Sequence, residues 1–220
     1  HSVRQVPPIQ LADALAGFAS IDPKGPIHIH IAEQRNDVDA HVEHFGARPV
    51  TWLLENVDVN SHWCLIHATH IDETETNTLA SSGAVAGLCP TTEANLGDGL
   101  FPFLAFLNAG GIWGIGSDSH VSVSPVEELR WLEYGQRLIH ESRNISAPQR
   151  GGATGARLYL DALRGGGQAL SRSIGVIEPG YRADLLVLDP SHVGVATAGE
   201  DDLLNSLVFS GNTNPILHVM

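Results

Sequence analysis

The sequence has few cysteines, few basic residues and no long apolar run, and each scarcity excludes a class of protein. Cys64 and Cys89 are the only 2 cysteines among 220 residues, and both lie in apolar, strand-like stretches. Two such residues do not make a disulfide framework, so we expect buried structural thiols in a reducing cytoplasm. No Cys-x-x-Cys pair occurs, which disfavours a cysteine-based zinc deaminase.

The scarcity of basic residues argues against nucleic acid as a partner. Lys and Arg number 12 against 25 Asp and Glu, and the formal net charge is −13. This charge, without any basic run, argues against nucleic-acid binding. No apolar stretch approaches the roughly 18–20 residues of a membrane span, and the amino terminus lacks the basic and apolar regions of a signal peptide. We therefore expect a soluble, cytoplasmic globular chain with no membrane partner.

A period-2 alternation of apolar residues and histidines runs from Ile27 to Ile31 and predicts a β-strand. Glu33 follows where this strand should give way to a loop. His30 and Glu33 are therefore expected together at the carboxyl end of the strand, where parallel α/β proteins keep their chemistry.

Two later strand ends offer matching groups. The predicted strand Cys64–His67 ends on His67, and the predicted strand Ile112–Ile115 is followed by Asp118. A single histidine at a strand end is usually a hydrogen-bonded structural residue, so no one of these positions indicates a site alone. Together they predict a divalent-metal hydrolase site, because each follows an apolar strand and precedes a helix-like segment.

Predicted strands and helices alternate along the first two thirds of the chain. The strands are Ile27–Ile31, Cys64–His67, Ala84–Cys89 and Ile112–Ile115, and the helices are Gln10–Ala19, Pro49–Asn56, Asp72–Ser82, Pro102–Ala109, Ser124–Glu141 and Ala156–Leu170. This alternation predicts a parallel sheet, and ligands at several strand ends favour a (β/α)₈ barrel over an open sheet. A complete barrel needs about 250 residues. The four strands therefore predict half a barrel.

Four further segments carry expectations that the structure can test. Pro90–Gly99 is predicted to be a long polar turn suited to substrate binding. Leu129, Leu132 and Leu138 are expected along one face of the long helix. The segment Gly175–Asp189 reads as a turn between two β segments, and Asn214–Met220 reads as a strand.

Several motifs in combination resemble the amidohydrolase superfamily, in its aminohydrolase (deaminase) branch. They are Ile29-His30-Ile31-Ala32-Glu33-Gln34, His67-Ala68-Thr69-His70, Thr92–Gly99, Gly116–His120, Glu127–Tyr134 and the later turn Pro179-Gly180-x-x-Ala183-Asp184-Leu185. The resemblance covers nearly the whole chain. It implies that residues 1–173 are the carboxyl-terminal half of a TIM barrel, from the end of strand 4 through strand 8. Residues 174–220 would be part of a small β-sandwich domain.

The resemblance also implies a reaction. Two runs, Thr92–Gly99 and Glu127–Tyr134, narrow the resemblance to a hydrolase that acts on a C–N bond of a linear amidine. The expected reaction converts N-formimino-L-glutamate and water to N-formyl-L-glutamate and ammonia, in histidine degradation. Two alternatives stay open: a nucleobase or nucleoside deaminase of the same superfamily, and an inactive fragment or binding module.

In this family one zinc ion is held by a His-x-His pair on strand 1, a His on strand 5 and an Asp on strand 8. The resemblance implies that His30 and Asp118 are the strand 5 and strand 8 ligands. The pair His28-x-His30 is not the strand 1 pair, because too few residues separate it from Asp118 to hold seven βα units. Two further ligands are therefore expected from a missing amino-terminal part.

The remaining roles also follow from the resemblance. Asp118 would accept a proton from the attacking water, Glu33 would pass protons to the leaving nitrogen, and His67 would orient or polarise near the attacked carbon. The substrate carboxylates need cationic partners, and Arg4 and His1 are the candidates. The alternative for Arg4 is a solvated terminal residue.

Other polar residues of the same loops are candidates for the pocket wall or for contacts to the catalytic groups. Glu93, Asn95 and Ser119, together with His120, could bind substrate or serve only the loop structure. His70 is expected to support the site rather than to bind metal. The chain begins with His rather than Met, so we expect it to start inside a larger protein. Relatives imply a homodimer, and the isolated chain is expected to hold little metal.

Overall fold

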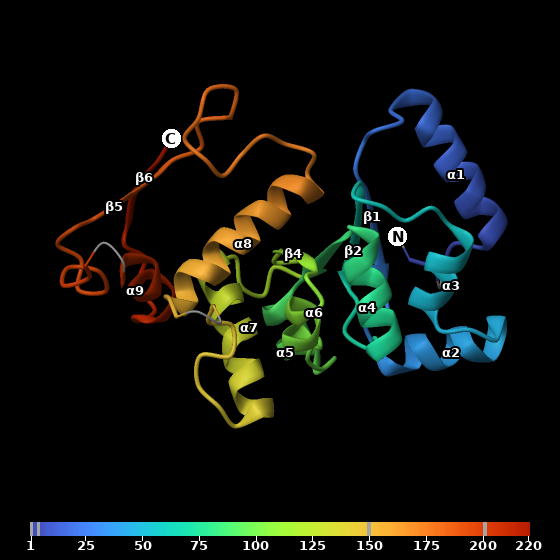
Figure 1. Ribbon diagram of the computed structural model, residues 1–220, viewed down its shortest axis with the longest axis horizontal. Coiled ribbons are helices and arrows are strands. Elements are labelled where there is room, and N and C mark those ends of the chain that lie inside the picture. Colours follow the sequence, from blue (N-terminus) through green and yellow to red (C-terminus); the bar gives the residue numbers. More distant parts are fainter. Residues whose placement is uncertain (1, 4, 149–150, 200–201) are drawn as a thin grey trace.

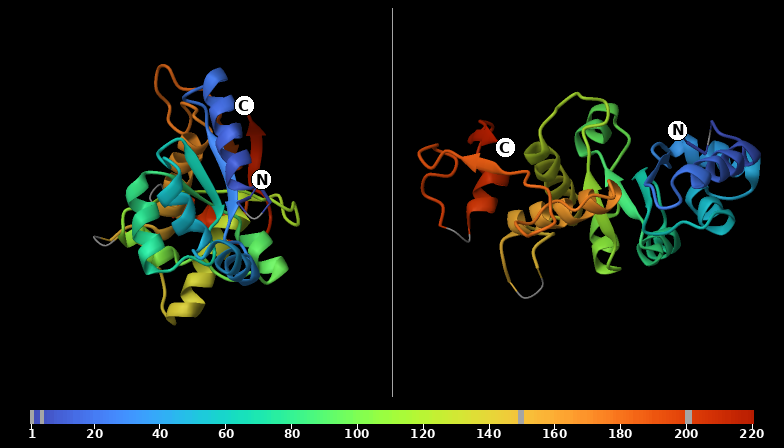
Figure 2. Two further views of the ribbon diagram at one scale, coloured as in Figure 1. Left: turned by 90° about the vertical axis from the view of Figure 1, so that its right-hand side faces the viewer. Right: turned by 90° about the horizontal axis from the view of Figure 1, so that it is seen from above.

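The computed structural model describes residues 2–3, 5–148, 151–199 and 202–220. Within these ranges four parallel strands form a sheet in the order β1-β2-β3-β4, and β5 and β6 form an antiparallel pair. The strands are β1 (Ile27–Ile31), β2 (Trp63–His67), β3 (Val85–Leu88), β4 (Ile112–Ile115), β5 (Leu186–Leu188) and β6 (Ile216–Val219). Figures 1 and 2 show the first helix and the β5–β6 pair at opposite ends of the molecule. The predicted α/β fold with four parallel strands is confirmed.

Helices connect the strands and extend beyond them. They are α1 (Pro8–Ile21), α2 (Arg35–Phe45), α3 (Pro49–Asn56), α4 (Glu73–Ser82), α5 (Pro90–Leu96), α6 (Phe103–Asn108), α7 (Pro125–His140), α8 (Thr154–Ala169) and α9 (Leu203–Phe209). Local side chains fix several helix starts: Asp72 accepts a hydrogen bond from the Glu75 amide, and Ser124 accepts one from the Glu127 amide. No helix among the described residues is both long and apolar enough to cross a bilayer.

The two faces of the main sheet differ. Ile29, Leu65 and Trp113 share one face and are buried in the main hydrophobic core with residues of the covering helices. His28 and Cys64 share the opposite face, which the carboxyl-terminal end of α8 reaches. There the His28 Nε2 atom donates to the Ala169 carbonyl oxygen at 2.7 Å. Beside β1, Ser2 makes an isolated parallel bridge with His30.

Glycine allows α8 to lie directly against β4. A Cβ atom placed on Gly165 would lie only 1.7 Å from the Trp113 carbonyl oxygen, so no side chain fits at this position without moving the helix. On the strand, a Cβ on Gly114 would lie 3.2 Å from the Gly166 amide nitrogen. Close approach of two backbones is a role that only glycine fills without strain.

The prediction of a polar turn at Pro90–Gly99 is wrong. Residues Pro90–Leu96 form helix α5, which begins with proline and ends at Gly97 in the left-handed conformation. Pro90, Thr91, Thr92 and Glu93 are buried, and polar atoms of the last three bond to Glu128, Ser117 and the Cys89 amide. The polarity of this segment therefore reflects internal hydrogen bonding.

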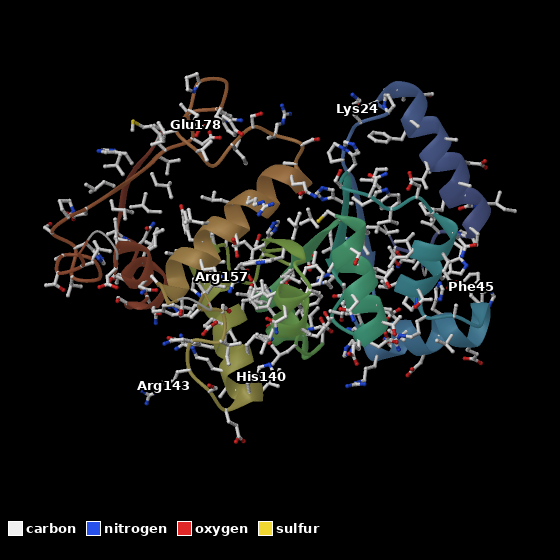
Figure 3. All side chains as sticks on the ribbon, in the orientation of Figure 1. Lys24, Phe45, His140, Arg143, Arg157 and Glu178 are labelled. Atoms are coloured by element: carbon white, nitrogen blue, oxygen red, sulfur yellow. The ribbon has the colours of Figure 1, made fainter. Side chains whose placement is uncertain are left out.

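Two other expectations are also corrected. Leu138 is 77% exposed, whereas Leu129 and Leu132 are buried, because nine helical residues turn Leu138 to the side opposite Leu129. The segment before β5 forms no strand: Ile177 is 88% exposed, and Figure 3 labels Glu178 on the same loop. Within the described residues, β5 and β6 pair only with each other. The expected strand at the carboxyl end is confirmed as β6.

Candidate active site

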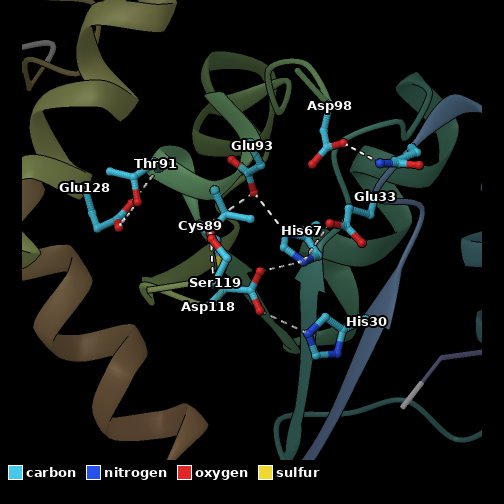
Figure 4. A network of polar contacts seen from close by, with 12 residues as sticks. His30, Glu33, His67, Cys89, Thr91, Glu93, Asp98, Asp118, Ser119 and Glu128 are labelled. Carbon is cyan, nitrogen blue, oxygen red and sulfur yellow. Dashed lines mark hydrogen bonds and ion pairs between the residues drawn. The ribbon is translucent and has the colours of Figure 1, made fainter. Parts of the chain in front are cut away.

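Four predicted side chains meet at the carboxyl ends of β1, β2 and β4 (Figure 4). The His30 Nε2 atom lies 3.6 Å from Oδ1 of Asp118, and the His67 Nε2 atom lies 3.9 Å from Oδ2 of the same carboxylate. The Glu33 carboxylate lies 3.7 Å from His67 Nε2. These residues come from three separate strand ends, as the parallel sheet requires.

The backbone at these strand ends takes uncommon conformations. His67 has φ 68° and Asp118 has φ 42°, and Ala32, between His30 and Glu33, has φ 49°. Left-handed backbone costs a non-glycine residue roughly 1–3 kcal/mol, and such strain gathers at functional sites. Hydrogen bonds between strand ends support the geometry: the Ala68 amide donates to the Ile31 carbonyl oxygen at 3.0 Å.

The ring of His67 is held by a buried carboxylate. Its Nδ1 atom lies 3.2 Å from Oε1 of Glu93, which also accepts a hydrogen bond from the Cys89 amide at 3.0 Å. His67 is fully buried and Glu93 nearly so. The opposite ring atom, His67 Nε2, is buried and has no hydrogen-bond partner among the described residues. This nitrogen therefore faces the space that His67 shares with Asp118 and Glu33.

The electrostatic surroundings shift three pKa values. Burial lowers the pKa of His67, but the hydrogen bond to Glu93 and the nearby carboxylates outweigh burial and raise it overall. The pKa of His30 is lowered, first by burial and then by the adjacent His67. Burial raises the pKa of Glu33, and the neighbouring Asp98 and Asp118 raise it further while His67 lowers it. Both Glu33 and His67 therefore hold a proton more readily than they would in water.

The structure tests whether these residues could hold a metal ion. One ligand atom from each of His30, His67 and Asp118 lies within 4.8 Å of the others. Two imidazole nitrogens and a carboxylate oxygen are a donor set suited to zinc. The orphaned Nε2 atom of His67 is aimed at the same space. The residues present therefore fit a divalent ion.

Other candidate residues are distributed unevenly. Ser119 is exposed, and its hydroxyl lies 2.9 Å from that of Thr92. Asn95 is exposed on α5, and no hydrogen bond among the described residues joins its side chain to the catalytic group. His70 donates to the Asp98 carbonyl oxygen at 2.7 Å, away from the metal-binding group. His120 is exposed next to Ser119. The candidates His1 and Arg4 lie outside the described residues.

Sequence reasoning missed two residues beside the site. Thr92 contacts both neighbours of Asp118 through its hydroxyl. Asp98 is buried and accepts a hydrogen bond from Gln34 at 2.9 Å, while its Oδ2 atom has no partner among the described residues. The sequence did carry a signal for the helix that holds Thr92: Pro90 stands at its start and Gly97 just after its end, a combination typical of helices.

The family model for the amidohydrolase family matches residues 1–220. The chain belongs to the amidohydrolase family. It is 54% identical over its whole length to the formimidoylglutamate deiminase of Pseudomonas aeruginosa, and covers 48% of that protein. It is 29% identical to the 5-methylthioadenosine/S-adenosylhomocysteine deaminase of Natronomonas pharaonis, and covers 49% of it. The resemblance inferred from the motifs is confirmed, and the chain spans about half the length of these curated relatives.

Two solved structures agree with the fold. An amidohydrolase from Brucella melitensis superposes with a TM-score of 0.89 at 44% identity, covering 100% of this chain and 46% of that one. A zinc-bound adenosine deaminase from Xanthomonas campestris superposes with a TM-score of 0.86 at 24% identity, covering 100% of this chain and 49% of that one. Matches to half of such chains agree with the carboxyl-terminal portion of a barrel.

Proposed function

We propose that the full-length amidohydrolase containing this chain is a zinc-dependent formimidoylglutamate deiminase. It would convert N-formimino-L-glutamate and water to N-formyl-L-glutamate and ammonia, a step of histidine degradation in the cytoplasm. The convergence of His30, Glu33, His67 and Asp118 at one edge of the sheet carries the reaction class. The 54% identity with the Pseudomonas aeruginosa protein supports the choice of substrate.

His30 and Asp118 would hold the zinc ion, with two further ligands from an amino-terminal part and the His67 Nε2 atom facing the same space. Zinc supplies a Lewis acid that makes water nucleophilic near neutral pH. The other steps belong to side chains of this chain. Asp118 accepts a proton from the attacking water through its carboxylate, whose two oxygens face His30 and His67.

Glu33 completes the proton transfer. Its raised pKa lets the carboxyl group hold a proton and release it to the nitrogen of the breaking C–N bond, so that ammonia leaves. His67 points Nε2 toward the attacked carbon because Glu93 holds the opposite nitrogen. The C=N bond of the formimino group is replaced by a C=O bond: the oxygen comes from water, and both protons of that water end on the leaving nitrogen as ammonia.

The substrate-binding residues and the domain division are part of the proposal. Arg4 and His1 would bind the two carboxylates of the substrate, and Glu93, Asn95 and Ser119 would shape or support the pocket. Residues 1–173 would belong to the barrel and residues 174–220 to a small β-sandwich domain. The assembled protein would be a homodimer.

The experiment is ammonia release by the full-length protein loaded with zinc. We expect turnover of N-formimino-L-glutamate and its loss in Glu33→Gln, which keeps the size of the side chain but removes the proton carrier. If a zinc-loaded preparation releases ammonia from another substrate but not from N-formimino-L-glutamate, the proposed substrate is wrong.

A nucleoside deaminase is the second candidate, because the chain is also 29% identical to the 5-methylthioadenosine/S-adenosylhomocysteine deaminase of Natronomonas pharaonis. The same assay with 5′-methylthioadenosine, S-adenosylhomocysteine and guanine separates the two. Ammonia from a purine substrate alone would leave the metal site in place and remove the proposed role of Arg4. A folded, zinc-free and inactive full-length protein would favour a catalytically dead chain.

A further inference from the structure

The hydroxyl of Thr92 contacts the residues on both sides of Asp118. Its Oγ1 atom lies 3.1 Å from the Ser117 carbonyl oxygen, 3.2 Å from the Ser119 amide nitrogen and 2.9 Å from the Ser119 hydroxyl. Thr92 itself is fully buried on α5. A single side chain from another element thus spans the turn that carries Asp118.

The donors and acceptors of this contact can be assigned completely. A threonine hydroxyl has one proton to donate and two lone pairs to accept with. The Ser117 carbonyl oxygen can only accept and the Ser119 amide can only donate, so Thr92 donates to the first and accepts from the second. The Ser119 hydroxyl must then donate to the remaining lone pair. Every bonding position of Thr92 is used within the turn.

The turn needs such support. Asp118 has φ 42°, in the left-handed region that costs a non-glycine residue roughly 1–3 kcal/mol. This backbone conformation sets the direction of the Cα–Cβ bond, and the carboxylate lies 3.6 Å from His30 Nε2. A relaxation of the turn toward ordinary φ values would turn the carboxylate away from the histidine.

We propose that Thr92 is a positioning residue that holds Asp118 in its metal-binding orientation. The inference rests on the proposed function, since it takes Asp118 as a metal ligand. It gives α5 a double role, because the next residue, Glu93, holds the ring of His67. Adjacent residues of one short helix then fix the separation of Asp118 and His67.

The test is Thr92→Val in the full-length protein, because valine keeps the shape and removes only the hydroxyl. We expect zinc affinity, measured by competition with a chelator, to fall about 10–100-fold, the usual range for residues that orient a ligand. The Ser119 amide should exchange its hydrogen faster than in the unchanged protein. Thr92→Ser, which keeps the hydroxyl, should restore both properties.

Thr91→Val is the matched control. Thr91 precedes Thr92 on the same helix and is also buried, but its hydroxyl bonds to Glu128 at 2.5 Å, away from Asp118. We expect this variant to lose thermal stability while its zinc affinity stays within about threefold of the unchanged protein. Equal weakening of zinc binding in both valine variants, or none in Thr92→Val, would overturn the inference.

Asp118→Asn distinguishes a failure of the inference from a failure of the proposed function. If Asp118→Asn leaves zinc affinity unchanged, the proposed metal site is wrong and the inference is wrong with it. If Asp118→Asn weakens zinc binding and Thr92→Val does not, only the inference is wrong. If Thr92→Val does not fold, Thr92→Ser compared with Thr92→Ala isolates the hydroxyl, and equal zinc affinity in those two variants would refute its role.

Discussion

The Nδ1 atom of His67 lies 3.2 Å from Oε1 of Glu93, with both side chains buried. This contact fixes the ring orientation, because a histidine held at one nitrogen presents the other in a defined direction. Here the presented atom is Nε2, which lies 3.7 Å from Glu33 and 3.9 Å from Asp118. Glu93 therefore acts on the site from outside it, through the histidine.

Replacing Glu93 by Gln should weaken this arrangement without leaving a cavity. A neutral amide is a poorer partner for a histidine whose pKa the carboxylate raises, and we expect kcat/KM to fall about 10–100-fold. Ammonia release under steady-state conditions measures it. Glu73→Gln, at an exposed glutamate of α4, is the control and should retain full activity. Similar losses in both variants would contradict the role given to Glu93.

Two histidines of β1 allow a paired prediction. His28 and His30 lie on the same face of the strand, but His28 bonds to the Ala169 carbonyl oxygen and His30 faces Asp118. We expect His30→Ala to lose most bound zinc in the full-length protein, measured by atomic absorption. His28→Ala should keep its zinc and lose about 1 kcal/mol of unfolding free energy, the worth of one hydrogen bond. Equal zinc loss in the two variants would exclude His30 as a specific ligand.

Cys64 should be chemically silent in the folded protein. It is buried, and burial raises the pKa of its thiol to about 12, so roughly one part in ten thousand is thiolate at pH 8. We expect no labelling of the peptide containing Cys64 by a thiol reagent at pH 8 in the native protein, and complete labelling after unfolding in guanidinium. Mass spectrometry of the digested protein reports both results, and rapid native labelling would contradict the burial.

The main sheet could be predicted from the sequence because its signals are local. Alternation from Ile27 to Ile31 defined β1 to the residue, and the same edge of the sheet then brought together His30, Glu33, His67 and Asp118. The carboxyl ends of parallel strands meet at one edge whatever the loops do. The parallel sheet and the meeting of these side chains at one edge therefore followed from pattern and topology.

Helix α5 shows why the remainder could not be predicted. Thr91, Thr92 and Glu93 are polar in sequence, and their partners Glu128, Ser117 and His67 lie 25 to 37 positions away in the chain. When the hydrogen-bond partner of a polar side chain is so far away in the sequence, the local sequence cannot show whether that side chain is buried or exposed to solvent. Leu138 was predicted on the face of Leu129 and Leu132, but it lies nine residues after Leu129 and is exposed on the opposite side of the helix.

The run Glu127–Tyr134, which narrowed the resemblance, includes a glutamate with a structural role. Within it, Glu133 is fully buried and accepts hydrogen bonds from Arg137, from the Ile145 and Ser146 amides and from the Ser146 hydroxyl. Glu133→Ala would leave these donors unpaired, and we expect a loss of about 2–4 kcal/mol of unfolding free energy.

Chemical denaturation of the full-length protein measures the effect of Glu133→Ala. Glu43→Ala, at an exposed position of α2, is the matched control and should change the unfolding free energy by less than about 0.5 kcal/mol. Residual activity per folded molecule should be unaffected by Glu133→Ala. If Glu133→Ala unfolds with the same free energy as Glu43→Ala, the hydrogen bonds of the buried carboxylate do not contribute to stability and the prediction is wrong.

The isolated chain offers the last prediction. In the proposed site His30 and Asp118 are two of four protein ligands, and the chain covers 48% of its Pseudomonas aeruginosa relative. Metal affinity depends on ligand number, so residues 1–220 expressed alone should hold well below one zinc per chain and release no ammonia. Equilibrium dialysis against zinc, beside the full-length protein, measures the difference. Stoichiometric zinc in the isolated chain would mean that His67 Nε2 completes a site with His30 and Asp118 without further protein ligands.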